Sequence, residues 1–150
     1  YIATLANGGT RYKFSVVDKV ETSSGEIIEQ SEPVVEQSIN ISQENLDAVY
    51  EGMRLVTQGT RGTLRTYFND FPINVAAKSG TAQENLLRSS HTWFVGFAPY
   101  ENPQISVTVM IPFGEYSPTP SAIVGRNIIA EYMGLNYTPE NSYMDVELAD

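Results

Sequence analysis

Several kinds of residue are scarce or missing in this chain of 150 residues. It has no cysteine, so it contains neither a disulfide framework nor a thiolate metal site. A single histidine, His91, excludes a histidine-rich metal cluster. No apolar run approaches the roughly 18 residues that a membrane-spanning helix needs. Nine basic residues, scattered along the chain, oppose eighteen acidic ones, and the net charge of −9 argues against nucleic acid as a partner.

Length and composition predict one globular domain over residues 1–150. A hydrophobic content of 41% is enough for a core. The chain opens on Tyr1 in helical register, with no initiator methionine and no capping residue, so we expect it to begin inside an element. The segment 136–150 is polar and acidic, and we expect it to be a loosely held tail.

The first sixty residues predict a helix end, a hairpin and a helix. The helix end spans 1–6 and is closed by asparagine and two glycines. Extended runs at 14–22 and 26–31 flank a Ser-Ser-Gly turn, which predicts a surface hairpin. Ser42 is a predicted N-cap of a helix that ends at Gly59. The apolar stripe of that helix is predicted at Leu46, Val49, Tyr50, Met53 and Val56.

The following segment predicts an antiparallel sheet covered by helices, an α+β fold. A short helical turn at 64–68 precedes strands at about 73–81, 92–98 and 104–111. The second strand has two apolar faces, which places it at the centre. A helix at about 120–133 is expected to cover one face of the sheet. Its broad apolar face is predicted to contain Val124, Gly125, Ile128, Ile129, Tyr132 and Met133.

The main candidate site is Lys78-Ser79-Gly80-Thr81 with Gln83, at the end of the first predicted strand. A lysine and two hydroxyls suit a substrate carboxylate, and a glycine lets backbone approach a ligand. Taken alone, such a tetrad is more often an ordinary strand-to-turn segment. Its context therefore decides how it is interpreted.

That context resembles the C-terminal part of penicillin-binding proteins, and more narrowly the class B transpeptidases. Three runs carry the resemblance: Val75 to Gln83 around Lys-Ser-Gly-Thr, His91 to Tyr100 with His-Thr-Trp-Phe-Val-Gly-Phe, and Tyr1 to Thr10. It covers most of residues 1–134. Alanine at position 77 departs from the glycine that commonly precedes the lysine. The resemblance implies the C-terminal part of the β-lactamase/transpeptidase-like fold, with residues 1–150 as one segment of a single transpeptidase domain.

The resemblance also implies roles for the tetrad. Lys78 would tune the electrostatics of a serine/lysine proton relay and attract a carboxylate. Ser79 and Thr81 would grip that carboxylate, the backbone N–H of Thr81 would donate in the oxyanion hole, and Gln83 would contact substrate at the rim. The family's Ser-x-x-Lys nucleophile motif does not occur in this chain. Ser38-Ile39-Asn40 matches the pattern of the Ser-x-Asn motif, but it lies just before the helix that begins near Ser42 and is interpreted as part of a strand and helix cap.

Other prominent side chains receive plainer interpretations. His91 is predicted to be structural or part of the rim, and Trp93 is predicted to be core. Three arginines are candidates for extending a positive field toward an anionic substrate, although surface arginines usually only solvate a face. They are Arg61, Arg65 and Arg88.

By resemblance, the function is that of a peptidoglycan D,D-transpeptidase whose catalytic serine lies outside this chain. The implied partners are the peptidoglycan stem peptide, β-lactam antibiotics and the remainder of the transpeptidase domain, with no cofactor and no metal. The implied location is the bacterial cell envelope, outside the cytoplasm and anchored by a region not in this chain. A β-lactam-sensing domain is the alternative, and a β-lactamase is weaker. Bare strand edges would also favour self-association of this chain.

Overall fold

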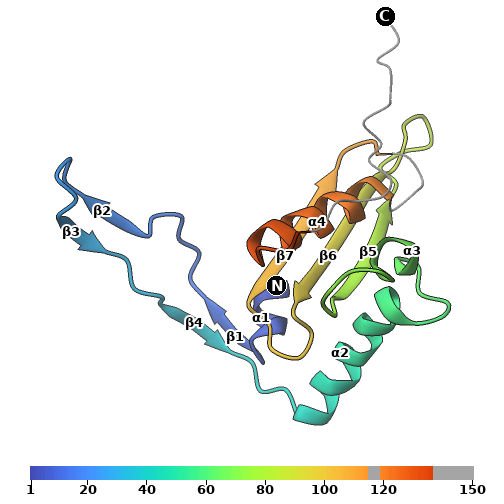
Figure 1. Ribbon diagram of the computed structural model, residues 1–150, viewed down its shortest axis with the longest axis horizontal. Helices are drawn as coiled ribbons and strands as arrows, with labels where there is room; N and C mark the ends of the chain where they lie inside the picture. The colour runs from blue at the N-terminus through green and yellow to red at the C-terminus, as the bar shows by residue number, and fades with distance from the viewer. Residues whose placement is uncertain (115–118, 137–150) are drawn as a thin grey trace, which may run out of the picture.

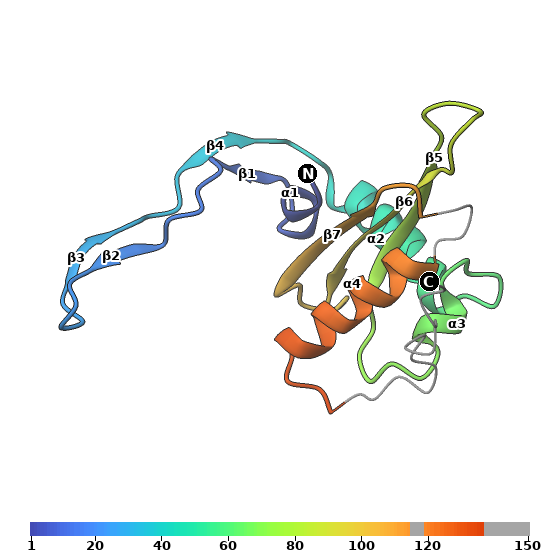
Figure 2. The same cartoon turned by 90° about the horizontal axis from the view of Figure 1, so that it is seen from above.

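The structure is a computed structural model that describes residues 1–114 and 119–136. The predicted tail therefore lies outside the described residues, apart from Asn136. Figures 1 and 2 show a compact body, made of a sheet between helices, and a long two-stranded arm that extends away from it. The short N-terminal helix α1 (Ile2–Ala6) lies where the arm joins the body.

The body is built on a three-stranded antiparallel sheet, as predicted. Its strands are β5 (Ala76–Ala82), β6 (His91–Ala98) and β7 (Ile105–Ile111), in the order β5-β6-β7. The central position of β6 is confirmed, because it pairs with both neighbours along its length. Two-sided apolar sequence in β6 is what a strand covered on both faces requires.

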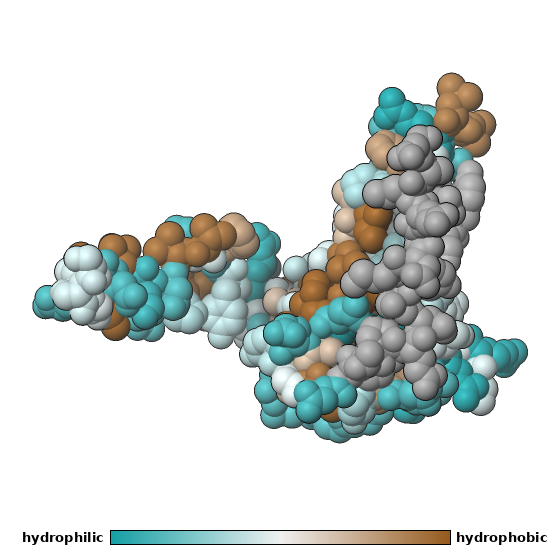
Figure 3. Space-filling view, turned by 45° about the horizontal axis from the view of Figure 1, so that its top comes forward, coloured by the Kyte–Doolittle hydropathy of each residue, from teal (hydrophilic) through white to brown (hydrophobic). Residues whose placement is uncertain are grey.

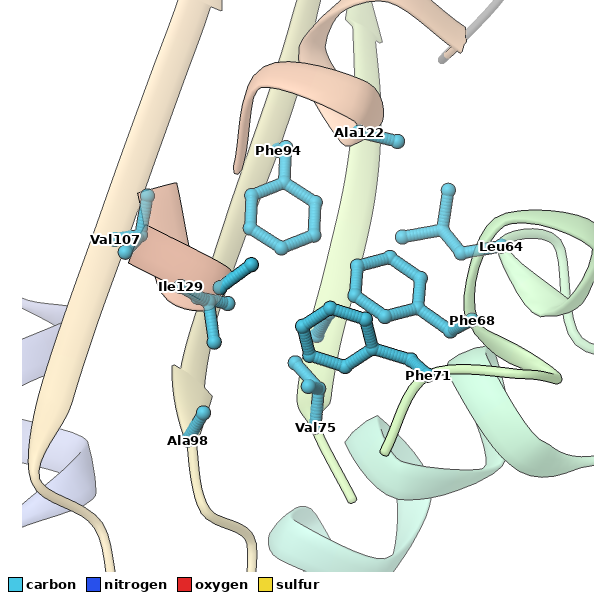
Figure 4. Packing of buried hydrophobic residues seen from close by; sticks show 11 residues of the cluster. Leu64, Phe68, Phe71, Val75, Phe94, Ala98, Val107, Ala122 and Ile129 are labelled. Atoms are coloured by element: carbon cyan, nitrogen blue, oxygen red, sulfur yellow. The ribbon is translucent and has the colours of Figure 1, made fainter. Parts of the chain in front are cut away.

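Helix α4 (Thr119–Tyr132) covers one face of this sheet. The Phe94 ring lies under it, so close that a Cβ on Gly125 would be 2.3 Å from a ring carbon. Phe94 also stacks on Phe68, with ring centroids 6.0 Å apart and planes 8° apart. Figure 4 shows these rings in the main core. The buried members of this core are Leu64, Phe68, Phe71, Val75, Ala77, Phe94, Ala98, Val107, Ala122, Ile129 and Ala130.

The predicted apolar face of α4 is only half right. Gly125 and Ile129 are buried, but Val124, Ile128 and Tyr132 are exposed. The buried stripe instead includes small and polar residues, namely Ser121, Ala122, Arg126 and Ala130. A helix that approaches a sheet closely needs small side chains at the contact, so the larger apolar ones lie to the side.

Helix α2 (Gln43–Gln58) packs on the opposite face of the sheet, near β5. Its predicted N-cap is confirmed, since the Ser42 hydroxyl accepts a hydrogen bond from Asn45 N at 3.3 Å. The rings of Tyr50 and Phe97 are 4.9 Å apart, and the Tyr50 hydroxyl donates to the Leu5 carbonyl, which ties α1 to α2. Val49, predicted to be on the buried stripe, is exposed.

The arm is longer than the predicted hairpin. The pair β2 (Lys19–Glu21) and β3 (Ile27–Gln30) confirms the hairpin around the Ser-Ser-Gly turn. Closer to the body, β1 (Thr10–Tyr12) pairs with β4 (Val35–Ser38), which the sequence analysis missed because these short segments show no apolar alternation. Many apolar side chains of the arm are exposed, including Phe14 at 86% and Val16 at 83%, and Figure 3 shows hydrophobic surface along it.

A polar network connects α2 to the turn between β6 and β7. Arg54 donates two hydrogen bonds to the Glu51 carboxylate, at 2.7 and 2.6 Å, and lies over the Tyr100 ring. Asn74 donates to Glu101 at 2.5 Å. These hydrogen bonds lower the pKa of the Glu51 carboxyl and of the Glu101 carboxyl below their ordinary value of 4.5.

In the part of the chain that the structure describes, no helix is long and apolar enough to cross a membrane.

The close contact between Phe94 and Gly125 generates a test with a matched control. Gly125→Ala is expected to lower the free energy of unfolding by about 1–3 kcal/mol, because the new methyl group overlaps a buried ring. Gly52→Ala, also within a helix but with no atom near its Cβ position, is expected to raise it by about 1 kcal/mol. Urea denaturation of both variants would measure this, and equal effects would contradict the packing described.

The network around Glu51 generates a pH prediction. A carboxyl whose pKa is lowered by folding stabilises the protein above its unfolded pKa, and this stabilisation is lost as pH falls through the folded pKa. The free energy of unfolding is therefore expected to fall as pH drops below about 4.5, and to fall less steeply in Glu51→Gln. Denaturant titrations across this pH range would measure both slopes. Glu29→Gln, on the arm and outside this network, is the control for the substitution itself.

Candidate functional site

The Lys-Ser-Gly-Thr tetrad lies on β5, at an edge of the sheet. Ala76 and Ala77 fix the beginning of the strand in the core, because both are fully buried. Beyond them the strand emerges: Lys78 and Thr81 are exposed, and the two residues between them are half-buried. Among the described residues β5 pairs only with β6, so its outer edge carries no strand.

The register of β5 and β6 separates the polar side chains of the tetrad. Ser79 pairs with Phe94 and Thr81 with Thr92, so both hydroxyl residues belong to the α4 side of the sheet. Lys78 pairs with Val95, on the α2 side. A single ligand can therefore reach the ammonium and both hydroxyls only by lying along the strand edge.

The connection between α2 and α3 (Arg65–Phe68) passes around this edge. Met53 of α2 packs with Phe97 on one face of the sheet, whereas Leu64 and Phe68 pack with Phe94 on the other. Between the connection and β5 lies a groove of about 380 Å³. It is lined by Gly52, Leu55, Val56, Gly59, Thr60, Arg61, Gly62, Thr63 and Lys78.

Two glycines allow the connection to fold back tightly on the end of α2. A Cβ on Gly59 would lie 2.5 Å from the Leu55 carbonyl oxygen, and one on Gly62 would lie 2.4 Å from that of Val56. The backbone N–H of Leu64 donates to the Val56 carbonyl at 3.0 Å, which closes the turn. This close return places the groove wall against β5.

Thr63 is a site residue that the sequence analysis missed. Its hydroxyl lies 3.2 Å from the Ser79 hydroxyl, within hydrogen-bond distance. Sixteen positions separate the two residues, so no local pattern connects them. The Lys78 ammonium in turn donates to the Ser79 carbonyl oxygen. Ser79 is thus fixed from both its side chain and its backbone.

Gly80 is constrained by its neighbour on β6. A Cβ at this position would lie 3.3 Å from the Cβ of Trp93, its cross-strand partner. Trp93 itself was predicted to be core and is only half-buried. The correction has a simple cause: α2 and α1 cover the Phe97 end of that face, leaving the Trp93 end less covered.

The other candidate residues occupy separate places. Gln83 follows the end of β5 and is exposed. Arg61 lines the same groove as Lys78, whereas Arg65 is exposed on α3 and Arg88 lies over the Phe113 ring, 5.5 Å from its centroid. Ser38, the first residue of the Ser-x-Asn match, is the last residue of β4 at the base of the arm. This position agrees with a structural role for Ser38 at the end of a strand.

Within residues 1–114 and 119–136, no three His, Cys, Asp or Glu side chains come together in a way that would hold a metal ion.

With this geometry established, similarity to known proteins identifies the family. Residues 1–130 match the sequence profile of the "Penicillin binding protein transpeptidase domain". The chain belongs to the penicillin-binding protein transpeptidase family. Penicillin-binding protein 2B of Streptococcus pneumoniae is 31% identical over 122 residues, covering 75% of this chain and 18% of the relative. Peptidoglycan D,D-transpeptidase MrdA of Haemophilus influenzae is 32% identical over 92 residues, covering 52% of this chain and 14% of the relative.

Solved structures confirm the transpeptidase fold. Penicillin-binding protein 2B of S. pneumoniae strain R6 superimposes with a TM-score of 0.77 at 29% identity, covering 95% of this chain and 25% of that one. Pseudomonas aeruginosa PBP2, in complex with WCK 5153, superimposes with a TM-score of 0.69 at 35% identity, covering 87% of this chain and 28% of that one. The resemblance to class B transpeptidases is thereby confirmed. This transpeptidase segment spans less than a third of the length of these relatives.

The fold of the groove wall can be tested at Gly62. Gly62→Ala is expected to lower the free energy of unfolding by about 1–3 kcal/mol, because the atoms that the methyl group meets are backbone oxygens, which cannot rotate away. Thr60→Ala, in the same connection and exposed, should change it by less than about 0.5 kcal/mol. Denaturant unfolding of the two variants provides the comparison. A Gly62→Ala variant of wild-type stability would contradict the tight return.

Proposed function

We propose that this chain supplies the substrate-binding strand of a serine D,D-transpeptidase whose nucleophile lies outside residues 1–150. The observation that carries the proposal is the tetrad on an unpaired strand edge, with Lys78 and Thr81 exposed in a chain of the transpeptidase family. The chain contains no Ser-x-x-Lys, so a separate part of the domain must provide the attacking serine. In this proposal the segment is one wall of a composite site.

In this proposal each residue of the tetrad has a role that its position supports. The ammonium of Lys78 attracts the carboxylate of a substrate at the strand edge and favours the charge arrangement in which the serine loses its proton. Ser79 and Thr81, on the α4 side, hydrogen-bond that carboxylate. Gly80 keeps the backbone accessible, and Gln83 contacts the substrate where the strand ends.

The oxyanion that develops during acyl transfer needs backbone donors that are already in place. We assign one of these donors to the backbone N–H of Thr81. The second is the backbone N–H of the catalytic serine, which lies outside this chain. The buried beginning of β5 supports this assignment, because Ala76 and Ala77 hold the strand rigidly against the core. Rigid placement is what lets such a donor stabilise the transition state without rearranging.

The proposed substrates share one chemistry, an acyl donor next to a carboxylate. They are the peptidoglycan stem peptide and β-lactam antibiotics, and the proposed place of action is the cell envelope, outside the cytoplasm. The remainder of the transpeptidase domain is the proposed partner for the exposed apolar residues of α2, such as Val49 at 46% and Leu55 at 47%. Without that partner, this chain alone would be expected to associate with itself.

Labelling with a fluorescent penicillin tests the proposal in the full-length protein. Lys78→Ala is expected to slow acylation by about a hundredfold, the typical effect of losing one electrostatic group in an acyl-transfer site. Lys19→Ala is the control, because Lys19 pairs with Glu21 on the arm. Rates would be measured from time courses of covalent labelling.

Residues 1–150 alone are expected to remain unlabelled under the same conditions. Stoichiometric labelling of this chain would refute the missing nucleophile, and an unchanged rate in Lys78→Ala would refute the role of the tetrad. Labelling of the full-length protein without transfer of a stem peptide would instead favour a β-lactam-sensing domain.

A further inference from the structure

Phe113, in the turn between β7 and α4, has an unusual backbone conformation. Its φ is +55°, and within the described residues every other position with positive φ is a glycine. A bulky side chain disfavours this region, so contacts in the surrounding structure must hold Phe113 there. Its side chain is 44% exposed, and burial in the core is therefore not the cause.

The contacts that hold Phe113 come from β6 and from the loop between β5 and β6. The Phe113 N–H donates to Nδ1 of His91 at 3.2 Å, and the two rings lie 4.9 Å apart at 51°. The guanidinium carbon of Arg88 is 5.5 Å from the centre of the Phe113 ring, within the range of a cation–π contact. We call Glu84, Arg88, His91 and Phe113 the latch.

His91 faces both segments of the latch. Because its Nδ1 accepts a hydrogen bond, the ring proton belongs on Nε2. That nitrogen lies 3.8 Å from a carboxylate oxygen of Glu84, on the β5–β6 loop. One imidazole therefore contacts the turn through one nitrogen and approaches the loop through the other.

The loop fastened in this way begins where the tetrad ends. Ala82 and His91 form the last pair of the β5–β6 ladder, directly after the pair of Thr81 and Thr92. Residues 83–89 are all exposed, and the tip carries Leu86 at 89% and Leu87 at 95%. A loop this exposed depends on its few contacts for its position, and the latch provides them through Glu84 and Arg88.

We propose that Phe113 is a positioning residue for substrate binding: it holds the β5–β6 loop so that the strand end at Thr81 and Gln83 forms a fixed rim of the site. This inference rests on the proposed function. Phe113 contacts the loop through Arg88 and β6 through His91, so its effect is on how well an acyl donor bearing a carboxylate binds. The chemical step depends on Lys78 and on the serine from elsewhere in the domain.

Acylation of the full-length protein by a fluorescent penicillin, followed over a range of concentrations, separates these effects. It yields the dissociation constant of the reversible complex and the limiting rate of acylation. Phe113→Ala is expected to raise the dissociation constant about tenfold, the combined effect of losing an aromatic pair and a cation–π contact, with the limiting rate within about twofold. Phe113→Tyr keeps both contacts and should restore wild-type binding.

Two further comparisons distinguish a latch from general destabilisation. Phe14→Ala removes a more exposed phenylalanine on the arm and should leave both constants unchanged. His91→Ala should also weaken binding, and the loss in the double variant should be smaller than the sum of the two single losses, because both single variants remove the same contact between the two rings. If Phe113→Ala does not fold, Phe113→Gly relieves the backbone strain and should show the same tenfold loss.

The outcomes are distinct. Wild-type affinity in Phe113→Ala or Phe113→Gly would overturn the proposal, as would a loss confined to the limiting rate or an equal loss in Phe14→Ala. In each of these cases the wild-type protein is still labelled, and the proposed function stands. A wild-type protein that is not labelled would defeat the proposed function and this inference with it.

Discussion

The contact between the Phe94 ring and Gly125 sets the distance between α4 and the sheet, and other packing follows from it. With the ring held against the helix backbone, its other side is free to stack on Phe68 of α3. Phe68 and Leu64 then anchor the connection that passes around the edge of β5. The groove beside Lys78 is bounded by this connection. The geometry at the edge of β5 therefore depends on Gly125 having no side chain, although Gly125 lies on α4, which packs against β6 and β7.

Patterns local in sequence predicted the framework of the fold. Two-sided apolar sequence in β6 and alternation in β7 identified the sheet, and Ser42 with Gly59 bounded α2. The pairing of β1 with β4 escaped because both strands are short and largely exposed, so neither shows an apolar alternation. On α4, hydrophobicity pointed to Val124, Ile128 and Tyr132, but close packing selected the smaller residues beside them. Size at the contact, rather than apolar character, decided which stripe was buried.

The candidate site divides in the same way. Residue types and spacing identified Lys78 to Thr81, and the β5–β6 register agrees with the expected alternation of their side chains. Thr63 and Phe113 were not predicted, because each meets its partner only through tertiary structure: Thr63 reaches Ser79 and Phe113 reaches His91 across sixteen and twenty-two positions. Groove walls and loop supports of this kind come from distant segments that carry no motif. A motif therefore specifies the chemistry of the site more completely than its shape.

The arm of residues 10–38 has a consequence for how cooperatively the chain unfolds. It joins the body at α1 and at the start of α2, and most of its side chains are exposed, so little apolar burial couples it to the sheet. Its backbone hydrogen bonds can open while β6 remains fully paired. Amide protons of β2 and β3 would then exchange with solvent through local opening, and those of β6 only through global unfolding. Hydrogen exchange would thus give a low free energy of opening for the arm and a higher one for the body, and the change from one to the other would fall close to α1.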